Sequence, residues 1–340
     1  MLIRVIILFL LSGINLNLRA QSVAIARESR EVLNDFEERT LHLLSKIGGL
    51  HQDFFGEAQP HVNQHHLSTF HHHLEKDKAH LQKDEAPSVD KHLKPAYFSL
   101  FNAMQNHVDL FHYGPEKILP DSVIAARQKL LEHAQVLVTE AGKLEHEVAA
   151  YCIFNRMTKP EDKSKIPGLI RAEFQKLNYL FKIQKLMIPV VQMEISCMEG
   201  FVPDSVPQAE KRRQRFDAFV TETLTALKNL PPCCGDHHIK QEAIASLHDF
   251  SMEAKKELPH LEKFLEEEED FILHHQKTKA ASAMSAAEKE AYRLAVQKYN
   301  EDIRLANELV RNLHIRRDAH LKLYQDAQKD FLKNFLTASP

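Results

Sequence analysis

Glycine and tryptophan are scarce in this 340-residue chain, which has nine glycines and no tryptophan. Glycine marks turns and strand irregularities, and a β-rich protein of this length would normally need many more. Alanine, leucine, glutamate, lysine and glutamine, which favour helices, are abundant instead. This composition predicts an all-α fold of long helices with few connections.

Common catalytic motifs are also missing. The sequence contains no HExxH, no G-x-S-x-G, no phosphate-binding glycine loop and no C-x-x-C-H, which are the usual signatures of zinc proteases, serine hydrolases, nucleotide-binding enzymes and c-type haem proteins. A di-iron bundle site needs two Glu-x-x-His spacings and two further carboxylates. The chain offers one such spacing, from Glu257 to His260, and Pro259 interrupts it. We therefore predict no catalytic residues, no bound cofactor and no enzymatic activity.

An excess of positive charge is lacking as well. The formal net charge is −3, whereas proteins that hold a phosphate backbone carry clustered lysine and arginine. This balance argues against nucleic acid as a partner. After the first twenty residues no apolar stretch reaches the roughly twenty residues that a membrane-spanning helix needs, so we expect no transmembrane span in the mature chain.

The first twenty residues have the layout of a secretory signal peptide. Arg4 gives a basic start, residues 5–11 are all apolar, and Ala20 is a small residue at the expected cleavage point. Cleavage after Ala24 or Ala26 and an uncleaved anchor are the alternatives. We expect an exported protein of the periplasm or the cell surface.

The remaining chain shows the apolar spacing of alternating three and four residues that amphipathic helices require. This pattern predicts long antiparallel helices, packed as one or two bundles with coiled-coil-like seams. The expected helices cover residues 22–55, 62–84, 96–112, 121–151, 165–199, 204–230, 237–277 and 285–335. The segment 200–207, rich in glycine and proline, divides an N-terminal bundle (21–200), histidine-rich in its first part, from a C-terminal bundle (201–340).

Local signals refine this assignment. Ser285 and Glu288 form a capping box, in which each side chain binds the other residue's backbone N–H. Pro189 and Pro259 fall inside helical patterns, and each removes a backbone hydrogen bond, so we expect a kink near both.

Histidine is the most unusual component, because 12 of the 22 histidines lie between residues 42 and 112. Side chains four apart on a helix lie above one another and can bind one metal ion, and neutral imidazole suits zinc and copper. The candidate ligands are His61, His65, His66, His72 and His73. The alternative is a solvated helix whose histidines have no common role.

The four cysteines of an exported chain permit disulfides. If helices 165–199 and 204–230 are antiparallel neighbours, the second returns the chain toward Cys152, whereas Cys197 lies at the opposite end. We expect Cys152 to pair with Cys233 or Cys234, or all four cysteines to remain reduced. The run from Cys233 to His238 is either a soft-metal site or a turn between helices, and we favour the turn.

These features predict an exported helical-bundle protein of the cell envelope or surface that acts as a non-enzymatic binding or structural module with a protein or envelope partner. The alternative function is a histidine-rich protein that binds or buffers zinc or copper in the periplasm.

Overall fold

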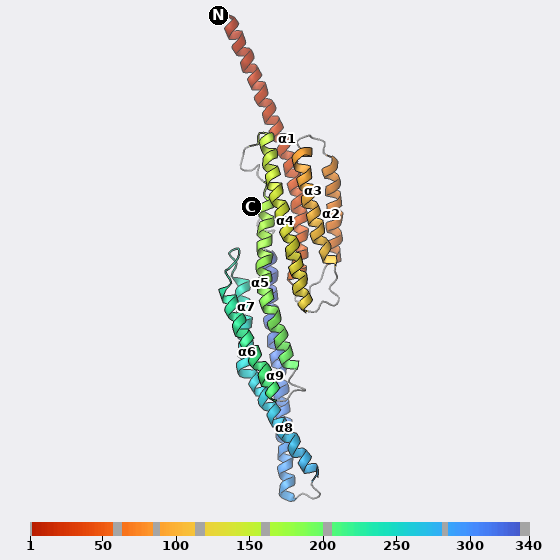
Figure 1. Ribbon diagram of the computed structural model, residues 1–340, viewed down its shortest axis with the longest axis vertical. Helices are drawn as coiled ribbons and strands as arrows, with labels where there is room; N and C mark the ends of the chain where they lie inside the picture. The colour runs from red at the N-terminus through yellow and green to blue at the C-terminus, as the bar shows by residue number, and fades with distance from the viewer. Residues whose placement is uncertain are drawn as a thin grey trace. The chain divides into compact units, whose positions relative to one another are not determined.

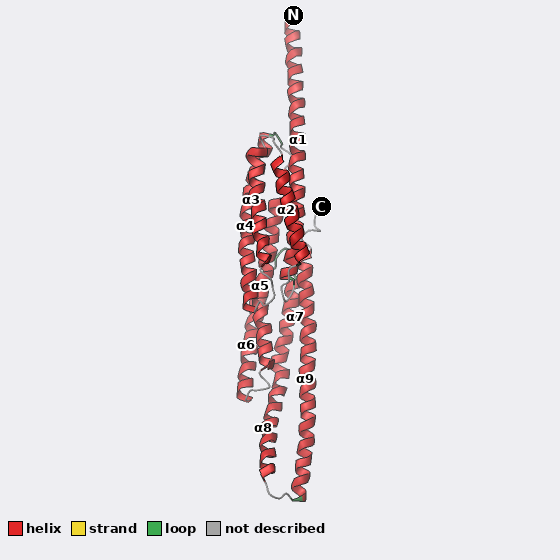
Figure 2. Cartoon of the chain, turned by 90° about the vertical axis from the view of Figure 1, so that its right-hand side faces the viewer, coloured by secondary structure: helices red, strands yellow, loops and turns green. Residues whose placement is uncertain are grey.

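Helices and their short connections make up the computed structural model over the residues that it describes, namely 2–56, 63–83, 89–112, 120–157, 164–199, 206–280 and 285–333 (Figure 2). Side chains are described from residue 24 onward, except at several positions next to the gaps. Within these ranges the chain forms no strand, and its isolated β-bridge joins Cys233 to Asp236. The predicted all-α bundle fold is confirmed.

The α-helices are α1 (Leu2–Phe55), α2 (Gln64–Lys83), α3 (Lys94–Asp109), α4 (Pro120–Phe154), α5 (Ile166–Glu199), α6 (Val206–Asn229), α7 (His238–Met252), α8 (Leu258–Ala280) and α9 (Ala286–Lys333). Shorter helical turns are η1 (Val89–Leu93), η2 (Leu110–His112) and η4 (Glu253–Glu257). Each helical range expected from the sequence has a counterpart here. The range 237–277 corresponds to α7, η4 and α8 in succession.

The chain divides into two compact units. Unit 1 comprises Met1–Asn178 with Leu332–Pro340, and unit 2 comprises Tyr179–Phe331, so the division falls inside α5. Residues 200–205, where the sequence predicts the boundary between bundles, lie outside the described residues. That domain boundary stays a prediction.

Unit 1 is built on α1 to α4, which lie side by side in Figure 1. The apolar stripe of α1 enters its core because Leu43, Ile47 and Leu50 recur every three or four residues, and all three are buried. Two polar groups join the helices from inside: Tyr151 Oη donates to the Ser29 carbonyl at 3.2 Å. Arg127 Nη2 of α4 donates to the Phe54 carbonyl of α1 at 3.0 Å.

The first part of α1 coincides with the predicted signal peptide. The structure gives the backbone of residues 2–20 as helix but describes no side chain before residue 24, so the signal peptide stays a prediction. Over the described residues, none of the helices is apolar for long enough to cross a membrane.

Unit 2 consists of the rest of α5 with α6 to α9. Its core contains Phe216 and Val220 of α6, Leu247 and Phe250 of α7, and Leu258 of α8, all buried. At the start of α9 the capping box is confirmed. Ser285 N–H donates to Glu288 Oε2 at 2.7 Å, and Glu288 N–H donates to Ser285 Oγ at 3.2 Å.

The expected disturbance at Pro259 takes the form of a π-helical turn, η4, between α7 and α8. Proline has no N–H, so the carbonyl four residues before it loses its α-helical partner. Leu258 N–H reaches back five residues to the Glu253 carbonyl, which is the π-helical pattern. Pro189 also lies inside its helix, α5.

Candidate functional site

A chain of buried polar side chains crosses unit 1. His51 of α1 is 2 % exposed and His107 of α3 is fully buried. The Nε2 atoms of the two imidazoles lie 2.8 Å apart, and His51 Nδ1 lies 2.9 Å from Oε1 of Glu173 on α5. One hydrogen-bonded series of side chains therefore connects α1, α3 and α5, which are far apart in sequence.

The Glu173 carboxylate only accepts, so His51 donates its Nδ1–H to Oε1. One of the two Nε2 atoms donates to the other, according to the tautomers of the rings. His107 Nδ1 is buried and has no hydrogen-bond partner among the described residues. Burial, followed by the charges of His51 and His133, lowers the pKa of His107 well below its usual value. His107 is therefore neutral at physiological pH.

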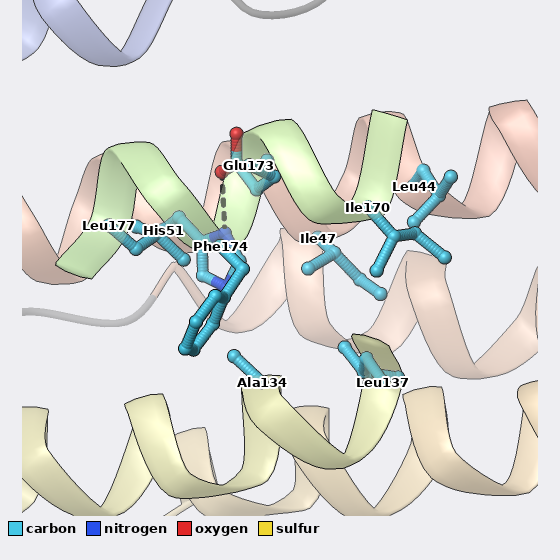
Figure 3. A pocket seen from close by; sticks show the side chains of 10 residues that line it. Leu44, Ile47, His51, Ala134, Leu137, Ile170, Glu173, Phe174 and Leu177 are labelled. Atoms are coloured by element: carbon cyan, nitrogen blue, oxygen red, sulfur yellow. Dashed lines mark hydrogen bonds and ion pairs between the residues drawn. The ribbon is translucent and has the colours of Figure 1, made fainter. Parts of the chain in front are cut away.

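A small apolar cavity adjoins this chain. Figure 3 shows His51 directed at Glu173, with aliphatic side chains from α1, α4 and α5 around the pair. The cavity holds about 20 Å³, which is room for roughly one water molecule. Glu173 Oε2 is buried and has no partner among the described residues. The site can therefore hold a proton or a water molecule, but it is too small for an organic substrate.

The histidines proposed as metal ligands point to different partners. His66 Nδ1 lies 3.0 Å from Asp53 Oδ2 on α1. The ring of His73 meets the edge of the His42 ring at a centroid distance of 4.6 Å, whereas His65 and His72 are exposed. His61 lies outside the described residues.

Neighbouring α2 histidines behave in the same way, since His71 faces Asp109 of α3 and His80 faces Asp35 of α1. The described imidazoles therefore spread around α2. In the part of the chain that the structure describes, three or more histidine, cysteine or carboxylate side chains nowhere come together as a metal site.

A second buried polar cluster lies in unit 2 and consists of ion pairs. Arg317 Nη1 of α9 lies 3.2 Å from Oε2 of Glu194 on α5, and Arg213 Nε of α6 donates to Glu262 Oε1 at 2.7 Å. Glu257, at the end of η4, accepts both terminal nitrogens of Arg316. The carboxylate of the Glu257-x-x-His260 spacing, the candidate half of a di-iron motif, is therefore engaged in an ion pair with Arg316.

Glu253 is the exceptional member of this cluster. It opens the π-helical turn, is 4 % exposed, and its Oε1 has no hydrogen-bond partner within the described residues. Burial, and then the negative charges of Glu194 and Glu257, raise its pKa to about 8. A carboxyl group that is protonated at neutral pH is a feature of functional sites and of strained buried clusters alike.

The hairpin formed by α8 and α9, which residues 281–285 join in the sequence, presents exposed apolar side chains. Phe271 of α8 stacks on Tyr299 of α9 at a centroid distance of 4.2 Å, and Tyr299 Oη donates to Glu268 Oε1 at 2.7 Å. These contacts align the two helices. Large aliphatic side chains remain about half exposed along the hairpin, namely Ile272, Leu273, Leu294 and Leu305.

A groove of about 280 Å³ runs between α8 and α9, and we call it the hairpin groove. Its apolar floor includes Leu261 and Phe264 of α8, and Leu305, Ala306 and Leu309 of α9. These positions follow the three- and four-residue spacing of a helix face, so the floor has the ridges on which another helix packs. Lys263, Glu267 and Asp302 add charged side chains to the lining.

All four cysteines are present as thiols. Cys152 and Cys197 are buried, and burial raises the pKa of Cys197 to about 11. The pairing of Cys152 with Cys233 or Cys234 stays a prediction. The segment after Pro232 is the turn that we favoured: Asp236 N–H donates to the Cys233 carbonyl at 3.1 Å. The sulfur atoms of Cys233 and Cys234 lie 2.8 Å apart.

Sequence reasoning did not find His51, His107, Glu173 or Glu253 as site residues. A usable signal exists for the first two. His51 follows buried Ile47 by four residues, and His107 follows buried Met104 by three, so both histidines fall on apolar helix faces. Comparison of the chain with protein-family models, with curated proteins and with solved structures gives no match.

Proposed function

We propose that the protein is an exported, non-enzymatic structural module of the cell envelope or surface that assembles by helix pairing along its hairpin groove. The observation that carries this proposal is the groove itself. Two helices present an apolar floor that includes half-exposed Leu305, and such a surface gains stability when a partner helix covers it.

The occupant that we propose is a second copy of the hairpin. Two two-helix hairpins that bury their apolar faces form a four-helix bundle, which is a common and stable arrangement. A symmetric dimer uses the same patch twice and forms a closed assembly.

Charge supports an antiparallel alignment of the two copies. Glu266 to Asp270 form an acidic run that includes Glu267 of the groove lining, and Lys256 lies beyond the other end of the groove along the same helical rod, next to Lys255, which faces Asp217 of α6. Measured from Glu262, Glu268 and Lys256 each lie about 9 Å away at 1.5 Å per residue. Antiparallel pairing about this point therefore places the acidic run of one copy near the lysines of the other.

Sedimentation velocity tests the assembly. The chain from Gln21 onward is expected to form dimers as its concentration rises from about 1 to about 200 µM, and Leu305→Glu is expected to keep it monomeric because a charge would enter the apolar contact. Leu323→Glu is the matched control, since Leu323 is 54 % exposed on the same helix but does not line the groove. A wild-type chain that stays monomeric, or equal loss of dimer in the control, would refute the proposal.

Export is tested separately by the N-terminal sequence of the chain recovered outside the cytoplasm. A mature start at Gln21 supports the signal peptide, and an intact leader on cytosolic material contradicts it.

Transition-metal binding or buffering remains the alternative function. The specific observation in its favour is the close approach of His42 and His73 across α1 and α2. Zinc titration of the untagged mature chain, followed by thermal stability, separates the two readings. A stoichiometric submicromolar site that is lost on replacing His42 and His73, or on replacing the predicted ligands His61, His65 and His72, would favour metal handling. Weak uptake of several ions without stabilisation would exclude it.

A further inference from the structure

The turn between α6 and α7 has a backbone conformation that its residues do not favour. Cys234 has φ +59° and Gly235 has φ +74°, so both central residues of the turn from Cys233 to Asp236 have positive φ. Two positive φ values in a closed four-residue turn define type I′, which favours Asn-Gly or Gly-Gly. A cysteine in the left-handed region costs roughly 1–2 kcal/mol relative to its ordinary conformation.

The surrounding chain holds this strained turn from both sides. Lys240 Nζ donates to the carbonyls of Lys228 and Leu230, at 2.8 and 2.5 Å, where α6 ends. On the other side, Asp236 Oδ1 accepts the His238 backbone N–H at 2.7 Å, one of the N–H groups at the start of α7 that have no partner within the helix. Residues in strained conformations persist when their surroundings fix them, and they cluster at functional sites.

The strained turn places two thiols within reaction distance of each other. Cys233 Sγ and Cys234 Sγ lie 2.8 Å apart, and Cys234 is exposed while Cys233 is half-buried. Alpha carbons joined by a trans peptide lie about 3.8 Å apart, whereas most disulfides span at least about 4.4 Å between alpha carbons. A disulfide between these neighbours would therefore be strained, and strained or exposed disulfides are the readily reduced ones.

We propose that Cys233 and Cys234 are a reversible dithiol–disulfide pair that exchanges with low-molecular-weight disulfides. The exposed Cys234 thiolate attacks one sulfur of the small disulfide and releases one small thiolate, which leaves a mixed disulfide on Cys234. The Cys233 thiolate then attacks the Cys234 sulfur and releases the second small thiolate. The two protein thiols lose two electrons and two protons in total, and the small disulfide gains them as two thiols.

This reaction depends on the exposure and proximity of the two thiols of the turn, and it requires no bound metal ion. Buried Cys197, whose pKa is raised to about 11, lacks the exposed thiolate that attack requires. The pair also differs from a structural disulfide, because it links residues that are already neighbours and therefore closes no loop in the unfolded chain.

The experiment uses the full chain, reduced and then exposed to oxidised glutathione. Intact mass and peptide mapping are expected to show a disulfide within the segment 233–234 and a loss of two titratable thiols, both reversed by dithiothreitol. In Cys233→Ser the glutathione adduct should persist on Cys234, because the resolving thiol is absent. Cys197→Ser is the matched control and should still form the disulfide.

Three results would overturn the proposal. They are a glutathione adduct that persists in the wild-type chain, a disulfide that joins Cys233 or Cys234 to Cys152 or Cys197, and four thiols that remain unchanged. Circular dichroism before and after oxidation shows whether the helices are intact. All three overturning results can be observed with the wild-type chain, so the test does not depend on whether a variant folds.

Discussion

Replacing Glu253 with glutamine should stabilise the protein, and more so as the pH rises. Glutamine keeps the shape of the side chain but cannot ionise. The pKa of Glu253 is raised from 4.5 to about 8 by burial and by nearby carboxylates, and each pKa unit corresponds to about 1.4 kcal/mol. The free energy of unfolding of Glu253→Gln should therefore exceed that of the wild type by roughly 5 kcal/mol at pH values above 8.

The direction follows from proton binding. Between pH 4.5 and about 8 the folded chain retains the Glu253 proton, whereas the unfolded chain has released it. Stability that depends on this proton is complete below pH 4.5 and falls as the pH rises, until the folded carboxyl also ionises. Wild type and Glu253→Gln should differ by less than about 1 kcal/mol at pH 5, and the variant should be more stable by roughly 3–5 kcal/mol at pH 9.

Urea denaturation at both pH values, followed by circular dichroism, measures the difference, and amide hydrogen exchange in α7 and α8 localises it. Glu222→Gln is the matched control, because Glu222 is exposed on α6 of the same unit and its substitution should leave the pH dependence unchanged. Equal stability of Glu253→Gln and wild type at pH 9 would refute the reasoning. So would a variant that is stabilised equally at both pH values.

Three other substitutions test separate parts of the structure. His107→Leu should lessen the loss of stability that the wild type shows as the pH falls below 6.5, by up to about 1.4 kcal/mol per pH unit, because buried His107 stays neutral while the unfolded imidazole takes up a proton. Urea denaturation from pH 7.5 to 5 measures this slope, and an unchanged slope contradicts the argument. Leu43→Ala should lower stability by roughly 2–5 kcal/mol because Leu43 is fully buried, and a thermal midpoint close to that of the wild type would show that this position is not core. Cys234→Asn should raise stability by about 1 kcal/mol because asparagine tolerates positive φ; a lower denaturation midpoint would argue against the strain.

Much of the fold follows from spacing along the sequence. Leu43, Ile47 and Leu50 recur at helical intervals, and all three are buried as that spacing requires. The start of α9 was also predictable, because the capping box of Ser285 and Glu288 depends on residues three apart. Such signals are local, and they report each helix independently of its neighbours.

The candidate sites depend on contacts that no local pattern contains. His51 and Glu173 are 122 residues apart, and only the packing of α1 against α5 brings them together. Glu253 looks like an ordinary surface glutamate in the sequence, because the π-helical turn that carries it breaks the regular spacing. The histidines of α2 show the same dependence on packing. Their spacing was regular, yet His66 contacts a carboxylate of α1 and His73 the ring of His42.

The π-helical turn η4 also sets the direction in which α8 presents its side chains. It adds one residue to the rod without adding a full step of regular helix. Each residue of an α-helix rotates the following side chains by about 100°. Because the turn absorbs its extra residue, the side chains of α8 keep a phase that the residue count from α7 alone would not give. The turn therefore decides which side chains of α8, the acidic run Glu266 to Asp270 among them, continue the faces of α7.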